Sequence, residues 1–259
     1  MTAETSELRN LWSPGRIWSD GAHLPSLIDL PIGVYSMGER EDDKFSTAAE
    51  RPRHRVEIAH PIAFGRLPIT VAEYSEFVGH SVGEDAFLPV ASVSWEDAMA
   101  YCEWLALRTG HHYRLPSEGE WEYACRGGKD DPFPTGEVLS PALANYLYEE
   151  DGTKVGPGRR TPVGSYPSNA FGLYDMAGNV CEWVSDAWHP NFEGAPSEGQ
   201  SWAGDSEAEC RVLRGGAWDY LPRLLRSSWR DYLPRQTRRD NVGFRVACSM
   251  TEHEEGLAG

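Results

Sequence analysis

Two segments of the sequence carry oxygen-donor side chains at spacings that suit a hard cation. The first places Asn145 and Asp151 around an expected turn, and the second places Asp175 and Glu182 seven residues apart with Gly178 between them. Calcium takes about six to eight oxygen ligands, including backbone carbonyls at irregular turns, so both segments could hold it. Asp and Asn are also common in loops because their side chains bond the local backbone. Spacing alone therefore favours ordinary loops.

No other segment carries a recognisable catalytic or metal-binding signature. A glycine-rich phosphate loop, an HExxH helix and a GxSxG turn are all absent. His111 and His112 are adjacent, so on a strand they would point to opposite faces, and we expect them on a polar surface. His54 and His60 flank an expected strand and are predicted to be structural.

The cysteines indicate neither a disulfide scaffold nor a zinc ribbon. Their number is odd and no CxxC pair occurs among them, so we expect them to be reduced and mostly buried, in a reducing cytoplasm. The five positions are Cys102, Cys125, Cys181, Cys210 and Cys248.

The charge is negative overall but unevenly distributed along the 259 residues. The net charge of −16 argues against nucleic-acid binding, because phosphate contacts need Lys and Arg. Residues 211–245 nevertheless hold nine Arg against three Asp, a net of +6, which leaves −22 for the remainder. We expect these arginines to pair internally with carboxylates or buried carbonyls, with an anionic ligand as the alternative.

The sequence contains no targeting or membrane segment that we can identify. Its apolar runs are shorter than the roughly 20 residues of a membrane helix, and its first residues lack a basic head and an apolar core. The 26 Gly and 18 Pro are spread along the chain rather than gathered in a linker. This composition predicts one soluble domain with many turns and no membrane partner.

Three helices are predicted from their first turns. A hydroxyl followed three residues later by a carboxylate forms a capping box at Thr70, Ser94 and Ser117. The helix after Ser94 has apolar residues at three- and four-residue spacing to about Arg108 and should end at Thr109–Gly110. We also expect strands at 31–37, 54–58, 211–214 and 243–248, and a long surface loop over 186–209.

Aromatic residues mark two further segments. Trp12 and Trp18 lie in an otherwise polar N-terminal stretch and are predicted to pack on the body, with a partner site as the alternative. The pentapeptide DYLPR occurs at 219–223 and again at 231–235, each time close after a tryptophan. Two copies are too few for a solenoid, so we expect two similar turns that each present an aromatic, an acid and an Arg.

An ordered series of motifs resembles the formylglycine-generating-enzyme (sulfatase-modifying factor) family. The resemblance implies a single α+β domain over residues 30–250 with a C-type lectin-like fold and little regular structure, an extension at 1–29 and a tail at 251–259. The motifs are ERPRHRV (50–56), LPITVAEYSEF (67–77), PVASVSW (89–95), YRLPSEGEWEYACRGG (113–128), GLYDMAGNVCEW (172–183), LRGGAW (213–218) and VGFR (242–245).

The same resemblance implies one or two bound calcium ions and so favours calcium in the two acidic segments. Asp175 stands where the family enzyme has Asn, and a carboxylate there should hold a dication at least as well. The family's ligand positions match Asn145, the Tyr146 carbonyl, Asp151 and the Thr153 carbonyl at one site, and Asp175, the Gly178 and Val180 carbonyls and Glu182 at the other.

The catalytic part of the family pattern is missing. The family enzyme oxidises a substrate cysteine with copper held by two cysteines, and a thiolate pair suits Cu(I). The second of these positions falls at Ser227 and the first near 222–224, and no cysteine lies between Cys210 and Cys248. We therefore expect neither copper nor formylglycine synthesis. Iron-dependent relatives of the ergothioneine pathway carry an N-terminal histidine domain, for which about 30 residues are too few.

The favoured function is a non-catalytic, calcium-stabilised module that binds a protein or small-molecule ligand through residues 217–241. The variable proteins of diversity-generating retroelements use the corresponding stretch, although the repeated DYLPR argues against random diversification here. Its aromatic, Arg and Asp content is typical of recognition surfaces. The predicted contact residues are Trp218, Asp219, Tyr220, Leu221, Trp229, Asp231, Tyr232, Leu233, Arg239 and Asp240.

Two other functions remain open from the sequence. One is a regulatory or scaffolding subunit of a larger bacterial signalling or defence assembly, with residues 1–25 as its candidate contact. The other is a metal-dependent oxidoreductase of the same superfamily, in which Asp186, His189 and Asp240 would have to meet in one pocket. For Trp218 and Trp229, the sequence supports a position in the core as well as it supports a position on the recognition surface.

Overall fold

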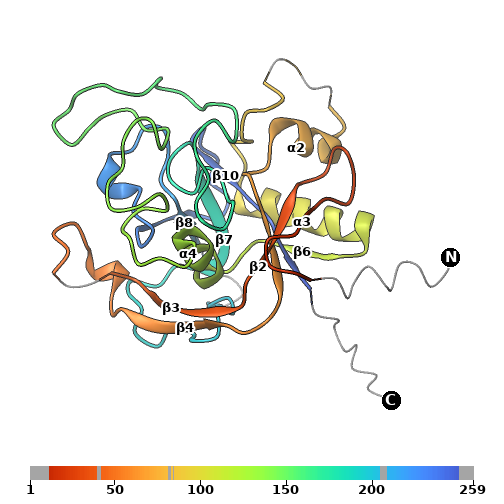
Figure 1. Cartoon of the computed structure of the whole chain (residues 1–259). Coiled ribbons are helices and arrows are strands. Elements are labelled where there is room, and N and C mark those ends of the chain that lie inside the picture. Colours follow the sequence, from red (N-terminus) through yellow and green to blue (C-terminus); the bar gives the residue numbers. More distant parts are fainter. Residues whose placement is uncertain (1–11, 40–41, 81–82, 84, 205–208, 251–259) are drawn as a thin grey trace.

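The computed structural model describes residues 12–39, 42–80, 83, 85–204 and 209–250. This part of the chain forms three sheets and three α-helices joined by long irregular connections (Figure 1). The predicted tail at 251–259 and residues 1–11 of the predicted extension lie outside the described residues. No helix in the described part is long and apolar enough to cross a membrane.

The three predicted capping boxes are confirmed as helix starts. In each, the hydroxyl accepts a hydrogen bond from the amide three residues on and the carboxylate there accepts from the capping residue's amide, which satisfies donors that the helix leaves free. Each helix ends at a glycine with positive φ. The helices are α2 (Val71–Val78), α3 (Trp95–Thr109) and α4 (Glu118–Arg126), ending at Gly79, Gly110 and Gly127.

The sheets bring together strands that are distant in sequence. The five-stranded sheet has the order β1 (Ile17–Trp18), β2 (Leu27–Leu30), β5 (Ile62–Gly65), β11 (Ala247–Ser249) and β6 (His112–Arg114). The four-stranded sheet has the order β10 (Val242–Phe244), β7 (Cys181–Ala187), β8 (Cys210–Arg214) and β9 (Arg230–Pro234). A hairpin of β3 (Gly33–Met37) and β4 (His54–Ile58) and two short 3₁₀ helices, η2 (Ala48–Glu50) and η3 (Pro222–Leu224), complete the described elements.

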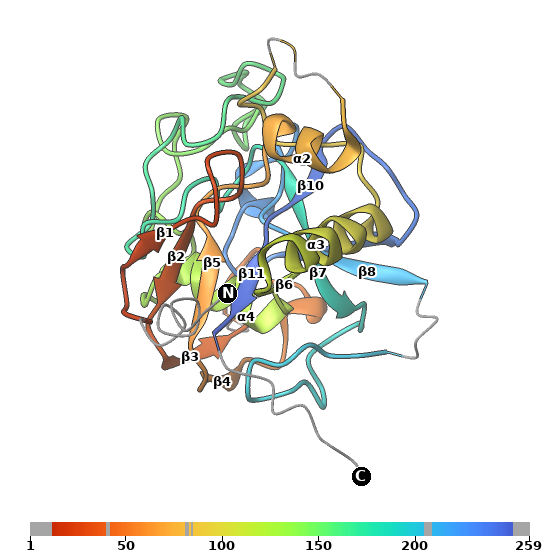
Figure 2. The ribbon, with the colours of Figure 1, turned by 90° about the vertical axis from the view of Figure 1, so that its right-hand side faces the viewer.

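The four-stranded sheet is covered on both faces. Trp183 packs in the cluster that contains the α3 residues Tyr101 and Leu105, whereas the next residue, Val184, packs with Trp121 of α4. This alternation follows from the two-residue period of a strand. Figure 2 shows α3 crossing in front of these strands with α2 above it. Side chains of β7, β8 and β9 therefore face either α3 or α4.

Two sequence predictions change at the ends of the domain. The strand predicted over 243–248 is two strands in different sheets, because the buried Arg245 at their junction pairs with Glu182 instead of continuing the ladder. The extension predicted for 1–29 is shorter, because β1 and β2 pair within the five-stranded sheet. Trp18 packs on the body as expected, donating from its indole to Asp29 and meeting His111 edge to face.

Candidate functional site: two acidic loops and the β9 surface

The first acidic loop contains a buried oxygen that lacks a hydrogen-bond partner. Asn145 is 1% exposed, and its Nδ2 lies 3.0 Å from the Arg159 carbonyl and 3.2 Å from Asn179 Oδ1. Its Oδ1 is buried and has no partner. Such an atom is costly unless a donor, a water or a cation satisfies it. This orphaned amide oxygen fits a calcium ligand.

Two of the other predicted ligands of this loop, Asp151 and the Thr153 carbonyl, lie in the turn over 149–153. Asp151 is exposed, and its Oδ1 accepts from the Thr153 amide at 2.9 Å, which lowers the pKa of the Asp151 carboxyl. The Thr153 carbonyl accepts from the Glu149 amide. The Tyr146 carbonyl lies so close to Gly156 that a Cβ there would come within 1.9 Å of it. The donor set is hard oxygen throughout, as calcium requires.

The second acidic loop is held in a left-handed turn. Asp175, Gly178 and Asn179 have φ values of 53°, 79° and 66°. Asp175 Oδ2 accepts from the Gly164 amide at 2.7 Å, and burial raises the pKa of this carboxyl to about 6. A Cβ on Gly178 would stand 2.3 Å from the Asn145 carbonyl, so this position needs glycine and the two loops pack directly on each other.

Glu182, the remaining side-chain ligand of the second loop, is already engaged. Its Oε2 accepts from Trp121 Nε1 and Arg245 Nε, and its Oε1 accepts from Arg245 Nη2, all at 2.7 Å. A carboxylate offers about four lone-pair sites, so three are occupied and Arg245 neutralises the charge. Val180 beside it is 1% exposed. The second loop therefore fits a cation less well than the first.

Ser227, where the resemblance predicts the family's second catalytic cysteine to fall, is buried. Ser227 is fully buried, its Oγ has no hydrogen-bond partner, and its carbonyl accepts from Arg214 Nη2 at 2.7 Å. The neighbouring thiol is Cys125, whose pKa is raised to about 12 by burial, so it stays protonated at neutral pH. All five cysteines are free and four are buried, in agreement with the expectation from sequence.

The Arg-rich segment pairs internally, as predicted. Arg214 lies 2.5 Å from Glu122 and 3.3 Å from Glu118, and Arg230 forms two bonds of 2.7 Å with Glu118. Arg226 is paired with Glu50 at 2.6 Å and 2.9 Å. These carboxylates come from η2 and α4, more than 90 residues away in sequence, so the network ties the C-terminal part of the domain to its N-terminal half.

The residues proposed for oxidation chemistry do not meet in one pocket. Asp186 is 3% exposed and accepts from the amides of Glu118 and Trp202, while the His189 ring stacks on Trp202 at 3.7 Å. Asp240 precedes β10, which pairs with the opposite end of β7, because Val242 lies beside Cys181. In the described ranges, no group of three or more His, Cys, Asp or Glu side chains could hold a metal ion.

The predicted contact residues of 217–241 differ widely in exposure. Trp229 and Leu233 are 7% and 8% exposed and belong to the core beside α3, so little of either side chain reaches the surface. Trp218, Tyr220, Leu221 and Asp231 are half-buried, and the exposed members are Asp219, Tyr232, Arg239 and Asp240.

Strand alternation divides these residues further. Asp231 and Leu233 face α3, where Asp231 lies near the Tyr220 hydroxyl at 3.4 Å. Tyr232 faces the opposite side and stacks on Trp188, with ring centroids 4.4 Å apart and planes 27° apart. A one-residue step along a strand reverses the face, so the stretch cannot present all its aromatic side chains to one ligand.

The exposed aromatic surface includes residues that the sequence reasoning placed in a plain loop. The Arg230 guanidinium lies 4.6 Å over the Trp188 ring and 4.2 Å over the Phe192 ring. Phe192, Arg230, Trp188 and Tyr232 thus form one stacked column, which we call the aromatic column, with Tyr232 at 44% exposure as its outer end. The signal that could have revealed it is the aromatic content of 188–202, with Trp188, Phe192 and Trp202.

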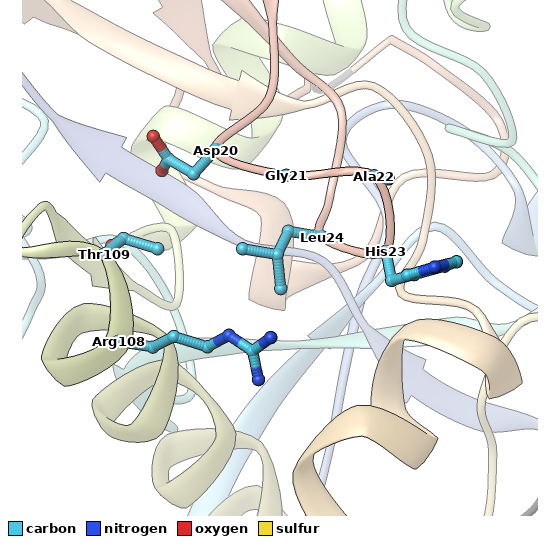
Figure 3. Close-up of a pocket in the computed structure, with 7 residues that line it drawn as sticks. All are labelled: Asp20, Gly21, Ala22, His23, Leu24, Arg108 and Thr109. Atoms are coloured by element: carbon cyan, nitrogen blue, oxygen red, sulfur yellow. The ribbon is translucent and has the colours of Figure 1, made fainter.

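Two cavities lie away from this column. One of about 320 Å³ is bounded by the β1–β2 turn and the end of α3, where the Arg108 side chain extends beneath Leu24 (Figure 3). Its Asp20 is already bonded to Tyr113 and His111, at 2.6 Å and 2.9 Å. Another of about 440 Å³ includes Ile58, Met99 and the Arg114–Glu120 ion pair. Neither is lined by residues 217–241.

Known proteins share this fold over nearly the whole chain. PvdO from Pseudomonas aeruginosa superposes with a TM-score of 0.81 and 34% identity, covering 92% of this chain and 99% of PvdO. Variable protein 1 of Treponema denticola superposes with a TM-score of 0.75 at 23% identity, covering 90% and 98%, and shares the fold alone. The predicted α+β, C-type lectin-like fold class is confirmed.

Comparison with related sequences agrees with the comparison of structures. Formylglycine-generating enzyme of Mus musculus is 32% identical over 238 residues, which is 83% of this chain and 60% of the mouse protein. Serine/threonine-protein kinase Pkn1 of Chlamydia trachomatis is 39% identical over 161 residues, 61% of this chain but only 24% of the kinase. The sulfatase-modifying factor enzyme 1-like domain model matches residues 19–250. The chain therefore belongs to the family of sulfatase-modifying factor enzyme 1-like domains.

Proposed function

We propose that this protein is a non-catalytic, calcium-stabilised binding module that recognises a protein or small-molecule ligand through the exposed part of residues 217–241. The observation that carries the proposal is the stack of Tyr232 on Trp188, which leaves a large aromatic side chain 44% exposed on a rigid strand. Tyrosine gives a large contact area at low entropic cost and is common among the residues that dominate binding energy.

The absence of the family's copper ligands supports a non-catalytic role. Ser227 stands at one of the two positions, and its hydroxyl cannot replace a thiolate as a ligand for Cu(I). The nearest thiol, Cys125, is fully buried and its pKa is raised to about 12. A buried, protonated thiol is inert. Specific binding is therefore the use that we favour for this scaffold.

Replacing Tyr232 with alanine should weaken ligand binding about tenfold or more, because the outer ring of the aromatic column is lost. A phage library of random dodecapeptides, selected on the purified full chain, supplies the probes, and titration of the enriched peptides measures the loss. Phe87→Ala is the matched control, since Phe87 is an aromatic residue that is 71% exposed elsewhere on the surface. Enriched peptides that bind Tyr232→Ala as tightly as the unchanged protein would refute the site.

Calcium should stabilise the protein through the first acidic loop. At a free calcium concentration of 100 Kd, the free energy of unfolding should rise by about 2.7 kcal/mol, and chelation should remove this gain. Asn145→Ala should abolish the response because Asn145 supplies the unpartnered buried oxygen. Asp175→Asn, in the second loop, should keep most of the stabilisation by calcium.

Two measurements test this expectation. Elemental analysis of protein purified without added metal or chelator should find calcium and neither copper nor iron. Thermal unfolding with calcium and with EDTA then measures the stabilisation in each variant. Stoichiometric copper or iron would overturn the non-catalytic proposal, whereas a response that persists in Asn145→Ala and disappears in Asp175→Asn would move calcium to the second loop.

A further inference from the structure

We propose that the open face of Tyr232 receives the guanidinium of an arginine side chain from a peptide or protein partner. This inference rests on the proposed binding function and names the chemistry that the site selects. The aromatic column already contains one such contact, because Arg230 lies between the rings of Phe192 and Trp188. A partner arginine on Tyr232 would repeat this arrangement at the outer end.

The internal part of the column is rigid. Arg230 is 5% exposed, and its Nε and Nη2 each lie 2.7 Å from an oxygen of Glu118. Its Nη1 donates to the Ala49 carbonyl at 2.8 Å. Trp188 contacts both Arg230 and Tyr232, so one face of the Tyr232 ring is supported. A ring held in this way loses little freedom when a ligand stacks on its other face.

The backbone of β9 cannot take over recognition at this position. β9 is an edge strand of its sheet, but the Tyr232 amide already donates to Asp231 Oδ1 at 2.9 Å, and Pro234 has no amide hydrogen. These are common ways in which an edge strand avoids pairing with another chain. The protein must therefore recognise a partner here through a side chain of that partner, and not by pairing β9 with a strand of the partner.

The negative net charge of the protein favours a positively charged partner side chain over a neutral aromatic one. The chain has a net charge of −16, so a basic partner is attracted over a long range, while the arginines of 211–245, the segment that contains Tyr232, are paired with carboxylates such as Glu118 and Glu50. The guanidinium of Arg230 is buried and paired with Glu118, which weakens its repulsion of a partner cation. A planar guanidinium stacks on aromatic faces and is more weakly hydrated than an ammonium group, which favours arginine over lysine.

The test compares arginine with its neutral isostere. Peptides that are enriched in the dodecapeptide selection and depend on Tyr232 should share an arginine. Replacing that arginine with citrulline keeps the planar shape and removes the charge, and should weaken binding by about 2- to 30-fold. In Tyr232→Leu the same replacement should have little effect, whereas Tyr232→Phe should keep the preference and Tyr232→Trp should strengthen it. Phe87→Ala again serves as the control.

The outcomes separate this inference from the proposed function. If the Tyr232-dependent peptides contain no common arginine, or bind equally well with citrulline, the guanidinium preference is wrong while the binding surface stands. If no enriched peptide depends on Tyr232, both are wrong. Equal loss on citrulline replacement in the unchanged protein and in Tyr232→Leu would place the arginine elsewhere, and this too would overturn the inference.

Discussion

Replacing Arg214 with methionine is expected to lower the free energy of unfolding by about 3–5 kcal/mol, the cost of breaking a buried ion pair from one side. Arg214 is fully buried and contacts Glu118 and Glu122 as well as the carbonyls of Ser227 and Ser228. Methionine fills much of the same volume, so the loss comes mainly from buried acceptors that lose their donor, namely Glu122 Oε2 and the carbonyls of Ser227 and Ser228. Glu122 is left with Arg126, and Glu118 with Arg230.

Unfolding of the unchanged protein and of Arg214→Met in guanidinium chloride measures this loss. The control is Arg55→Met, which breaks the Arg55–Glu57 pair, whose side chains are 64% and 45% exposed. Exposed pairs contribute about 0–1 kcal/mol, so the control should lie near the unchanged protein. Adding Glu122→Gln to Arg214→Met should lower the stability further, because it takes the carboxylate partner from the buried Arg126. Equal, small losses in Arg214→Met and Arg55→Met would show that the network does not stabilise the fold.

Local features of the fold were predictable from sequence because they depend on neighbouring residues. A capping box is complete within four residues, so Thr70, Ser94 and Ser117 identified the helix starts. Internal pairing of the arginines followed from their number in an acidic chain. Their partners did not, because Glu50 and Glu118 reach Arg226 and Arg230 only through the tertiary fold.

The candidate site was predicted less well, for the same reason. Composition marked 217–241 as aromatic and polar but could not give the face of each residue. Leu233 and Tyr232 are adjacent, yet the strand sends one into the core and the other to the surface. Trp188, the ring that supports Tyr232, lies 44 residues earlier in a segment that we expected to be a plain loop. The column exists only because β7 and β9 share a sheet.

Asp186 should make the stability of the protein depend on pH between about 4 and 7. Burial and the nearby charge of Glu118 raise the pKa of this carboxyl to about 7, despite the amides of Trp202 and Glu118 that donate to it. An unfolded aspartate titrates near a pH of about 4. Between these two values the folded protein holds a proton that the unfolded chain has lost. The stabilisation from this proton is therefore complete below about pH 4 and is lost as the pH rises through about 7.

The variant Asp186→Asn isolates this contribution, because its side chain does not titrate. The difference in unfolding free energy between the unchanged protein and Asp186→Asn should change by roughly 3–4 kcal/mol from pH 4 to pH 8. The unchanged protein should become less stable relative to Asp186→Asn as the pH rises. The informative quantity is the change of this difference with pH. Its size at a single pH also contains a constant loss, because the side-chain amide of the variant puts an NH₂ group in place of one carboxylate oxygen that accepts a hydrogen bond. Asp240→Asn, an exposed carboxylate, is the control. A difference that stays constant across the range would mean that Asp186 is ionised throughout, and that its two amide donors outweigh its burial.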